Sequence, residues 1–462
     1  MLKTETKKDE FLLSCGKREL VDKILVLEDE VEKLNEENKA LKERAEKLES
    51  LLKRNSKNSS SPPSLDKKKR KKNPNPKPKG APKGHKGGTK LDFGVPDNVS
   101  MVELPDLCPD CESCLKDAEI INTHVQAVAE LVETPIEVTE YIYREVKCPG
   151  CNKEIKAKIP ENVLPNEQYG PRLQGWLFLQ KGYSHQSNKK LVESCNVFGV
   201  EISQGTLNNQ LKKLNKALKS PVEELRDWNK EQDFVHMDET GWSKCCSSKK
   251  WMWTVSTKLT SYLEARKTRG TVEIKALVGE DYDGVIVSDR AKCYEPYKKR
   301  QLCWAHLKRD IQVCIESKLD SDNKFGNRMM KYVSEIFHPL DKGFPVKKKM
   351  KMFLENEWNH PPKKTKAKTL RKALLKSWDN LWRFEDSDIP PDNNEAERSL
   401  RLSVTHRKVC GASRTEWGAE AISKLFTVIQ TCNKQGKDKL EFISKSLLAY
   451  AHNKSYPSLV PK

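Results

Sequence analysis

Five segments between residues 234 and 289 follow one another in an order that few folds can accommodate. The segments "FVHMDETGW", "KWMWTVST" and "SYLEAR" are predicted strands, "TVEIKALVG" is a predicted helix, and "GVIVSD" is a predicted buried strand. We expect the first strand to end at Asp238 and the last at Asp289. The predicted order is strand, strand, strand, helix, strand, with a carboxylate at the end of the first and fourth strands.

A ribonuclease H-like core has this order, and its sheet brings the ends of the first and fourth strands side by side. Two carboxylates held together repel each other unless a cation lies between them, and hard oxygen ligands suit Mg²⁺ or Mn²⁺. Each aspartate alone could instead cap a strand end. The pair in this order predicts a divalent metal site.

The segment "PPDNNEAERSLR", residues 390–401, raises a related question. An exposed helix that pairs its own charges would explain it, but two adjacent asparagines followed by Arg398 and Arg401 suggest a surface that meets phosphate. A carboxylate such as Glu397 is unfavourable where an anion docks. A divalent metal ion between the carboxylate and the phosphate would remove the repulsion between these two negative groups.

The net charge of the chain indicates the class of binding partner. The chain has 462 residues, enough for roughly two to four domains, and its net charge of +19 favours a polyanion, either nucleic acid or an anionic membrane surface. The start of the chain lacks the apolar core of a signal peptide, and no apolar run approaches the ~18 to 20 residues of a spanning helix. We therefore expect a cytoplasmic, nucleoid-associated protein without a membrane partner.

Two N-terminal segments have simple patterns. Residues 17–54 carry a heptad seam with leucines at d and a single asparagine, Asn38, at a, which favours a parallel dimer, although one helix packed on its own globule would also show an apolar stripe. Residues 55–92 are rich in Pro, Gly, Ser and Lys, including Lys68, Lys69 and Arg70. This composition predicts a disordered basic linker that either improves solubility or binds phosphate.

Two C-x2-C pairs lie within the predicted domain at 100–160. Cys108 with Cys111 and Cys148 with Cys151 have the spacing of zinc knuckles, and Cys114 is an alternate ligand. The β-rich segment between the pairs predicts hairpin strands. A small zinc-binding β domain is expected, and unliganded structural cysteines are the alternative.

Residues 165–225 are predicted to be helical, with a break at residues 198–200 and a new helix capped by Ser203. This pattern is typical of a helix-turn-helix, although similar helix pairs occur in cores that never touch DNA. If the pair binds DNA, the residues that reach base edges are Gln204, Thr206, Asn208 and Asn209.

The motifs "HMDETGW", "VSDRAKCY", "QLCWAHLKRD" and "PPDNNEAERSLR", with the zipper, the "PKGHKG" linker and the paired knuckles, resemble a transposase of the insertion sequence 66 family. The resemblance implies a DDE transposase with Asp238, Asp289 and Glu397 as catalytic and metal-binding residues. It implies that Asn393 and Asn394 shape the turn into the helix and that Arg398 and Arg401 face the DNA backbone.

The resemblance also implies two-metal phosphoryl transfer with Mg²⁺ or Mn²⁺ at the element's terminal inverted repeats and at target DNA, assisted by small accessory proteins. Asp289 and Glu397 are 108 residues apart (397 − 289), so an insertion must separate them. We expect it to be all-helical, from about 305 to 388, with His306 supporting the site.

These predictions together describe a multidomain α/β protein with a coiled coil, a zinc-binding β domain, a helix-turn-helix region and a ribonuclease H-like catalytic domain at 230–455. A homodimer or higher oligomer through the coiled coil is expected. Two alternatives remain open, namely a nuclease on the same core and a non-catalytic DNA-binding repressor derived from a transposase.

Overall fold

The computed structural model divides into two compact units. The first comprises Met1–Arg70, Asp233–His236 and Asp283–Asn394, and the second comprises Lys71–Gln232, Met237–Tyr282 and Glu395–Lys462. The residues that the structure describes are 27, 30–38, 40–42, 44–45, 95, 99, 106, 110–114, 135–142, 144–147, 149, 151, 154–243, 249–337, 346–356, 365–385, 388–411, 413 and 415–461.

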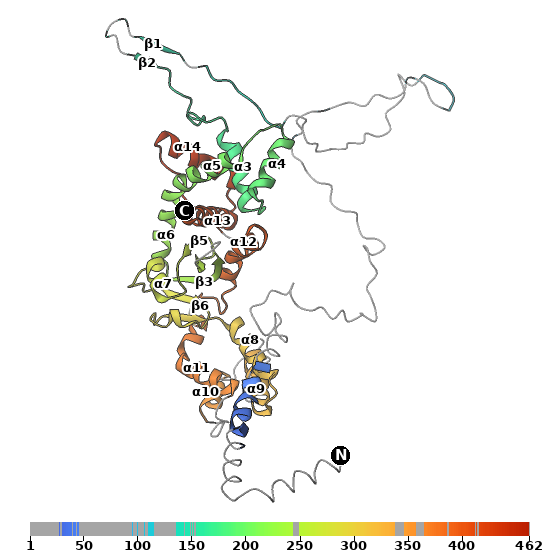
Figure 1. The fold of residues 1–462 in the computed structure, drawn as a ribbon, viewed down its shortest axis with the longest axis vertical. Helices are drawn as coiled ribbons and strands as arrows, with labels where there is room; N and C mark the ends of the chain where they lie inside the picture. The colour runs from blue at the N-terminus through green and yellow to red at the C-terminus, as the bar shows by residue number, and fades with distance from the viewer. Residues whose placement is uncertain are drawn as a thin grey trace, which may run out of the picture. The chain divides into compact units, whose positions relative to one another are not determined.

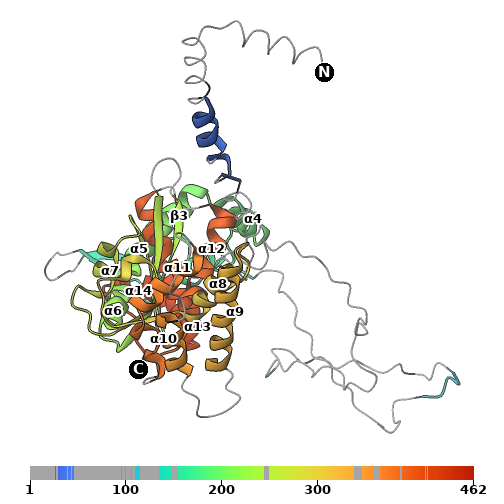
Figure 2. The same ribbon diagram turned by 90° about the horizontal axis from the view of Figure 1, so that it is seen from below.

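A five-stranded mixed sheet has the strand order β5-β4-β3-β6-β7. Strands β5, β3 and β6 are labelled in Figure 1, and β3 is labelled in the second view, Figure 2. β3 runs parallel to β6, β6 runs parallel to β7, and β4 runs antiparallel to β5. Helix α7 lies between β5 and β6 in the chain, so the predicted order of three strands, a helix and a strand is confirmed. The bounds are β3 Phe234–Ser243, β4 Lys249–Ser256, β5 Ser261–Arg266, α7 Thr271–Val278, β6 Val285–Ser288 and β7 Arg300–Leu302.

The first strand is longer than predicted. Asp238 does not end β3, which continues to Ser243. The polar run after Met237 resembles a strand end, but Glu239 is buried in an ion pair with Arg269 and Trp242 is almost fully buried. Because both side chains are accommodated in the interior, the strand continues past them.

Helix α13 (Glu416–Gln435) closes the open edge of the sheet at β5. The hydroxyls of Thr427 and Thr431 accept the backbone N–H groups of Leu263 and Ser261 at 2.9 and 3.1 Å. Both threonines are fully buried. The helix therefore satisfies edge groups that would otherwise remain open to pairing with another chain.

Helices α3, α4 and α5 form a small apolar cluster in the second unit with Leu177, Leu191 and Leu207 at its centre. Between α4 and α5 the chain turns at Gly199, whose φ of 71° suits glycine. The next helix is capped by Ser203, whose hydroxyl accepts the N–H of Thr206 at 3.0 Å. The helix bounds are α3 Pro171–Gly182, α4 Asn188–Val197, α5 Gln204–Ala217, α6 Lys219–Lys230 and α14 Lys439–His452.

The segment between β7 and residue 388 is helical where the structure describes it. Its four α-helices surround an apolar core that includes Trp304, Trp378 and Trp382, and they lie together in Figure 1. Two short 3-10 helices, Asp379–Leu381 and Arg383–Glu385, return the chain toward α12 (Asn394–Cys410). The helix bounds are α8 Trp304–Ile315, α9 Asp320–Phe337, α10 Val346–Asn356 and α11 Lys366–Lys376.

The N-terminal predictions fall partly or wholly outside the described residues. The described residues 30–38 are helical, and the seam residues Leu27, Val31, Leu34 and Leu41 are more than half exposed in this single chain. The linker at 55–92, with Lys68, Lys69 and Arg70, lies outside the described part of the chain.

Part of the predicted hairpin between the two cysteine pairs lies outside the described residues. Residues 135–142 have no regular secondary structure. The observed strands, β1 (Glu145–Lys147) and β2 (Glu154–Lys156), pair antiparallel around the second C-x2-C motif. A β-branched composition favours strands only where a partner strand covers the backbone, and residues 135–142 have none among the described residues.

Candidate functional site

The two aspartates are related by the register of the sheet. The pairs between β3 and β6 are Phe234↔Val285, Val235↔Ile286 and His236↔Val287, each 51 residues apart. Asp238 and Asp289 are also separated by 51 residues (289 − 238). Each aspartate therefore follows the last paired residue of its strand by two positions.

Each aspartate is oriented by a local backbone donor. An oxygen of Asp238 accepts the N–H of Glu239 at 2.9 Å, and an oxygen of Asp289 accepts the N–H of Ala291 at 2.8 Å. Both residues are half-buried. Such a bond restricts the rotation of its carboxylate.

Glu397 lies in the first turn of α12 and is half-buried. The turn before this helix is formed by Asp392, whose carboxylate accepts the N–H of Asn394 at 3.0 Å. Arg398 and Arg401 are exposed on the same helix, and Arg398 pairs with Glu395 at 2.6 Å. The two arginines are therefore placed where a ligand in solvent can reach them.

A buried chain of hydrogen bonds within the first unit joins the segments that precede the three acids. Nδ1 of His236 donates to Oδ1 of Asn393 at 3.1 Å, since an amide oxygen can only accept. The backbone N–H of Asn393 donates to the sulfur of Cys303 at 3.1 Å, and the N–H of Cys303 donates to the carbonyl of Ser288 at 3.0 Å. We call His236, Ser288, Cys303 and Asn393 the buried node.

The buried node is close in sequence to every predicted catalytic residue. Its members His236, Ser288 and Asn393 precede Asp238, Asp289 and Glu397 by two, one and four positions. His236 is 3% exposed and Asn393 is completely buried, so these bonds are shielded from water. The sequence motifs that contain the acids also contain the residues of the buried node. The sequence did not indicate which of these residues bond to each other.

A second buried network, in the second unit, was not predicted. Lys434 donates to the carbonyls of Thr257 and Thr260 at 2.7 Å and pairs with Glu395 at 2.7 Å. Burial lowers the pKa of Lys434 to about 8, against the opposing effect of Glu395. Burial raises the pKa of Glu395, but hydrogen bonds from Lys434 and Arg398 outweigh it and the pKa lies below its usual value. The network ties α12 to α13 two residues before Glu397.

The three predicted acids all lie within the described residues, whereas the predicted zinc ligands lie partly outside them. In the part of the chain that the structure describes, no three His, Cys, Asp or Glu side chains form a group that could hold a metal ion. Among the predicted zinc ligands, Cys111, Cys114 and Cys151 are exposed, and Cys108 and Cys148 lie outside the described part. His306 is half-buried in the first turn of α8, and its supporting role stays a prediction.

The predicted DNA-reading residues lie at the start of α5. Gln204, Asn208 and Asn209 are exposed, while Thr206 is half-buried. The hydroxyl of Thr206 is bonded to that of Ser203 at 2.9 Å, and Asn208 accepts from Asn188 of α4 at 3.1 Å. Three side chains are therefore available to a ligand, and Thr206 contributes mainly to the cap.

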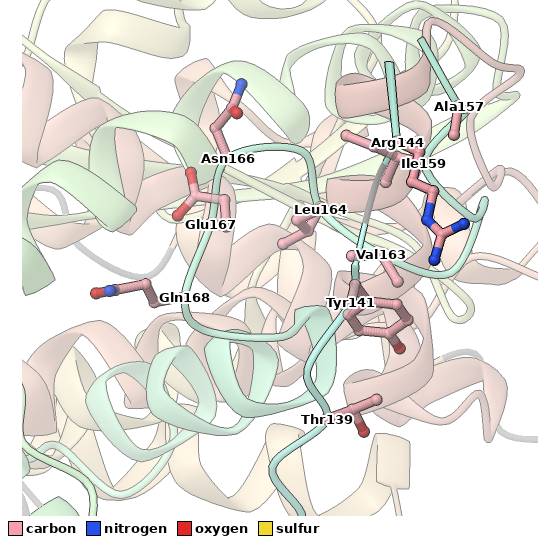
Figure 3. A pocket seen from close by; sticks show the side chains of 10 residues that line it. All are labelled: Thr139, Tyr141, Arg144, Ala157, Ile159, Val163, Leu164, Asn166, Glu167 and Gln168. Atoms are coloured by element: carbon pink, nitrogen blue, oxygen red, sulfur yellow. The ribbon is translucent and has the colours of Figure 1, made fainter. Parts of the chain in front are cut away.

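A cavity of about 540 Å³ lies near the base of the β1–β2 hairpin (Figure 3). Tyr141 and Arg144 line it, as does Glu167, which is bonded to Gln210 at 2.7 Å and paired with Lys213. None of the three predicted acids lines this cavity. It is therefore not the predicted catalytic site.

The comparisons with known proteins identify the family. A model of the Transposase IS66 family matches residues 166–421, or 256 residues (421 − 166 + 1) of 462. The chain belongs to this family. A family of unknown function (DUF6444) matches residues 15–90 of this chain. The chain is also 20% identical over 408 residues to the uncharacterized protein y4hP of Sinorhizobium fredii, covering 77% of this chain and 73% of that protein.

The region that matches the family model contains Asp238, Asp289 and Glu397 together with the whole buried node. The four cysteines of the C-x2-C pairs lie before it. Among the helices that the structure describes, none has the length and apolarity that crossing a membrane requires.

Proposed function

We propose that this chain is a DNA transposase that binds the ends of its insertion sequence and catalyses metal-dependent DNA cleavage and strand transfer on a ribonuclease H-like core. The observation that carries the proposal is the equality between the 51-residue register of β3 against β6 and the spacing of Asp238 and Asp289. Family membership supports the same assignment.

The two aspartates and Glu397 are proposed to form one site for two Mg²⁺ or Mn²⁺ ions. Their donor set fits because all three offer hard carboxylate oxygens, and because backbone N–H groups already orient both aspartates. When bound, the ions would activate the attacking water or 3′ hydroxyl and stabilise the leaving oxygen. Arg398 and Arg401 would bind phosphate oxygens of the DNA backbone.

Other parts of the proposed function concern substrate and assembly. The exposed side chains at the start of α5, namely Gln204, Asn208 and Asn209, are proposed to read the terminal repeats. Cys108, Cys111, Cys148 and Cys151 are proposed to hold a structural zinc ion. Residues 17–54 are proposed to form the dimer, and small accessory proteins are proposed partners.

The catalytic assignment is tested by Asp238→Asn, Asp289→Asn and Glu397→Gln, singly and combined. We expect each variant to bind DNA normally but to lose roughly 10³-fold or more of its Mn²⁺-dependent nicking of DNA carrying the element's ends. The triple variant should be little worse than the single variants, because residues that act as one unit are strongly non-additive.

The matched control is Asp283→Asn, which removes an exposed carboxylate six residues before Asp289 that pairs with Lys299 at the surface. Its nicking rate should remain near that of the wild type. A near wild-type rate for Glu397→Gln would remove that residue from the site. Nicking without strand transfer would indicate a nuclease, and DNA binding without nicking in the wild type would indicate a repressor.

A further inference from the structure

Helices α10 and α11 carry an unusual concentration of positive charge. Their sequences, "VKKKMKMFLEN" and "KAKTLRKALLK", contain nine Lys or Arg and a single acid, Glu355. The surrounding acids reduce this charge only partly, since Glu385 pairs with Lys347 and Glu295 pairs with Lys376. The exposed lysines of α10 and α11 include Lys348, Lys351, Lys366 and Lys372, which we call the insertion face.

The two helices pack in the same apolar core and are joined by hydrogen bonds. Met350 and Leu354 of α10 and Leu370 and Leu374 of α11 are buried in the same apolar core. Arg371 bonds to the carbonyl oxygens at the end of α10, including that of Glu355 at 3.1 Å. These bonds position the charged side chains on a fixed support, which lowers the entropy lost when a ligand binds.

Aromatic side chains lie under part of this charge. Nζ of Lys351 is 6.0 Å from the ring centroid of Trp378, and Nζ of Lys347 is 4.9 Å from that of Trp382. Both tryptophans are nearly fully buried. The lysine stems can therefore lie against apolar surface while the ammonium groups remain in solvent.

The helical segment is attached next to the buried node. At its start, the N–H of Trp304 donates to the carbonyl of Pro391 at 2.9 Å, so the chain leaves and returns at one place in the first unit. Trp304 follows Cys303 directly, and Pro391 precedes Asn393 by two residues. The segment that carries the insertion face is therefore anchored by the residues that precede Glu397.

We propose that the insertion face binds the phosphate backbone of duplex DNA without reading its sequence. Lysines are compact charges that suit phosphate but supply no bidentate code for bases, so the interaction should position DNA rather than select it. A solvated lysine surface is the alternative. The choice of DNA as the polyanion rests on the proposed function, but the binding itself requires no catalysis.

The test uses the full chain with Lys348→Gln, Lys351→Gln, Lys366→Gln and Lys372→Gln combined. Binding to two fluorescent duplexes, one with the element's ends and one unrelated, is measured without divalent metal from about 50 to 200 mM salt. We expect affinity for both duplexes to fall by about tenfold or more. The slope of log affinity against log salt should become shallower by roughly 0.9 for each phosphate that the variant no longer neutralises.

A matched control removes four exposed lysines that are already paired with carboxylates. These are Lys219, Lys275, Lys445 and Lys454, whose partners are Glu223, Glu280, Glu441 and Glu161. Both quadruple variants lower the net charge equally, so equal weakening in both would overturn the proposal. An unchanged salt slope in the insertion-face variant, with an unchanged circular dichroism spectrum, would also overturn it.

Two further results distinguish DNA binding by the insertion face from membrane binding and from the catalytic assignment. If the insertion-face variant keeps DNA affinity but loses binding to vesicles of anionic lipid, the surface serves a membrane and the proposal fails. If Asp238→Asn and Glu397→Gln retain nicking while the insertion-face variant loses DNA affinity, the catalytic assignment fails and the DNA-binding face stands.

Discussion

Asn393 joins, within the first unit, segments that precede the three acids in the sequence. Its side chain bonds to His236 on β3, and its backbone bonds to Cys303, which in turn bonds to the residue before Asp289. The residue is completely buried. An amide that makes these bonds in the interior is costly to remove, because its partners lose their hydrogen bonds without gaining water.

We predict that Asn393→Ala destabilises the protein by about 1–3 kcal/mol by removing the acceptor of the buried His236 ring. It should also lower the nicking rate of the molecules that remain folded, because the segments carrying the acids would be less constrained. Thermal unfolding gives the first quantity, and nicking at a temperature where both proteins are folded gives the second.

The control for this prediction is Asn394→Ala, which removes the neighbouring amide from a half-buried position at the start of α12. Its effect on both quantities should be small. If Asn393→Ala lowers stability but leaves nicking by the folded fraction unchanged, the buried node is structural and does not position the site.

The strands differ in how far other elements stabilise them. β5 is an edge strand whose backbone is completed by the threonines of α13. The hairpin of β1 and β2 has two strands of only three residues each, and such a hairpin is at best marginally stable in water. Its register places Cys148 and Cys151 in the connection between the strands.

We predict that a zinc ion supplies the missing stability of this hairpin. Metal analysis of the full chain should find about one zinc per chain, as a single four-cysteine site requires. Removing the metal with a chelator should make residues 100–160 more susceptible to limited proteolysis, because metal binding and folding are coupled in small zinc domains.

Cys151→Ser should abolish zinc binding, whereas Cys293→Ser, a half-buried cysteine outside the C-x2-C pairs, should retain it. A chain with no zinc and the same resistance to proteolysis would leave these cysteines as unliganded residues.

At the scale of the whole molecule, the N-terminal helix presents an apolar seam to solvent. Val31, Leu34 and Leu41 are 55%, 57% and 62% exposed. Asn38 occupies the next seam position after Leu34, and its side-chain amide donates to the carbonyl of Leu34 at 3.0 Å. An exposed heptad seam with a single asparagine matches what a second copy of the same helix would cover.

We predict that the full chain sediments as a dimer and that Leu34→Glu combined with Leu41→Glu makes it monomeric, because two charges would replace core positions of the seam. Asn38→Val should strengthen association but allow more than one oligomer, since the buried amide pair selects two strands. Glu36→Gln, which lies off the seam, should leave the dimer intact. A monomeric wild type at high micromolar concentration would contradict the prediction.

The sequence by itself determined the order of three strands, a helix and a strand along the chain, and the spacing of the two aspartates. Both can be read along the chain, because apolar runs define the strands and the spacing is a count of residues. It also indicated the cap at Ser203 and the turn at Gly199, where the signal spans only a few residues. The predicted end of β3 was wrong because burial of Glu239 and Trp242 depends on distant partners.

Only the tertiary structure decided which buried groups satisfy one another. His236 and Asn393 are 157 residues apart, and Asn393 and Cys303 are 90 apart. No periodicity or composition relates such residues, because their pairing follows from the packing of separate elements. The Lys434 network and the threonines that close β5 arise for the same reason: a buried polar group must find a partner, and the fold determines which one is within reach.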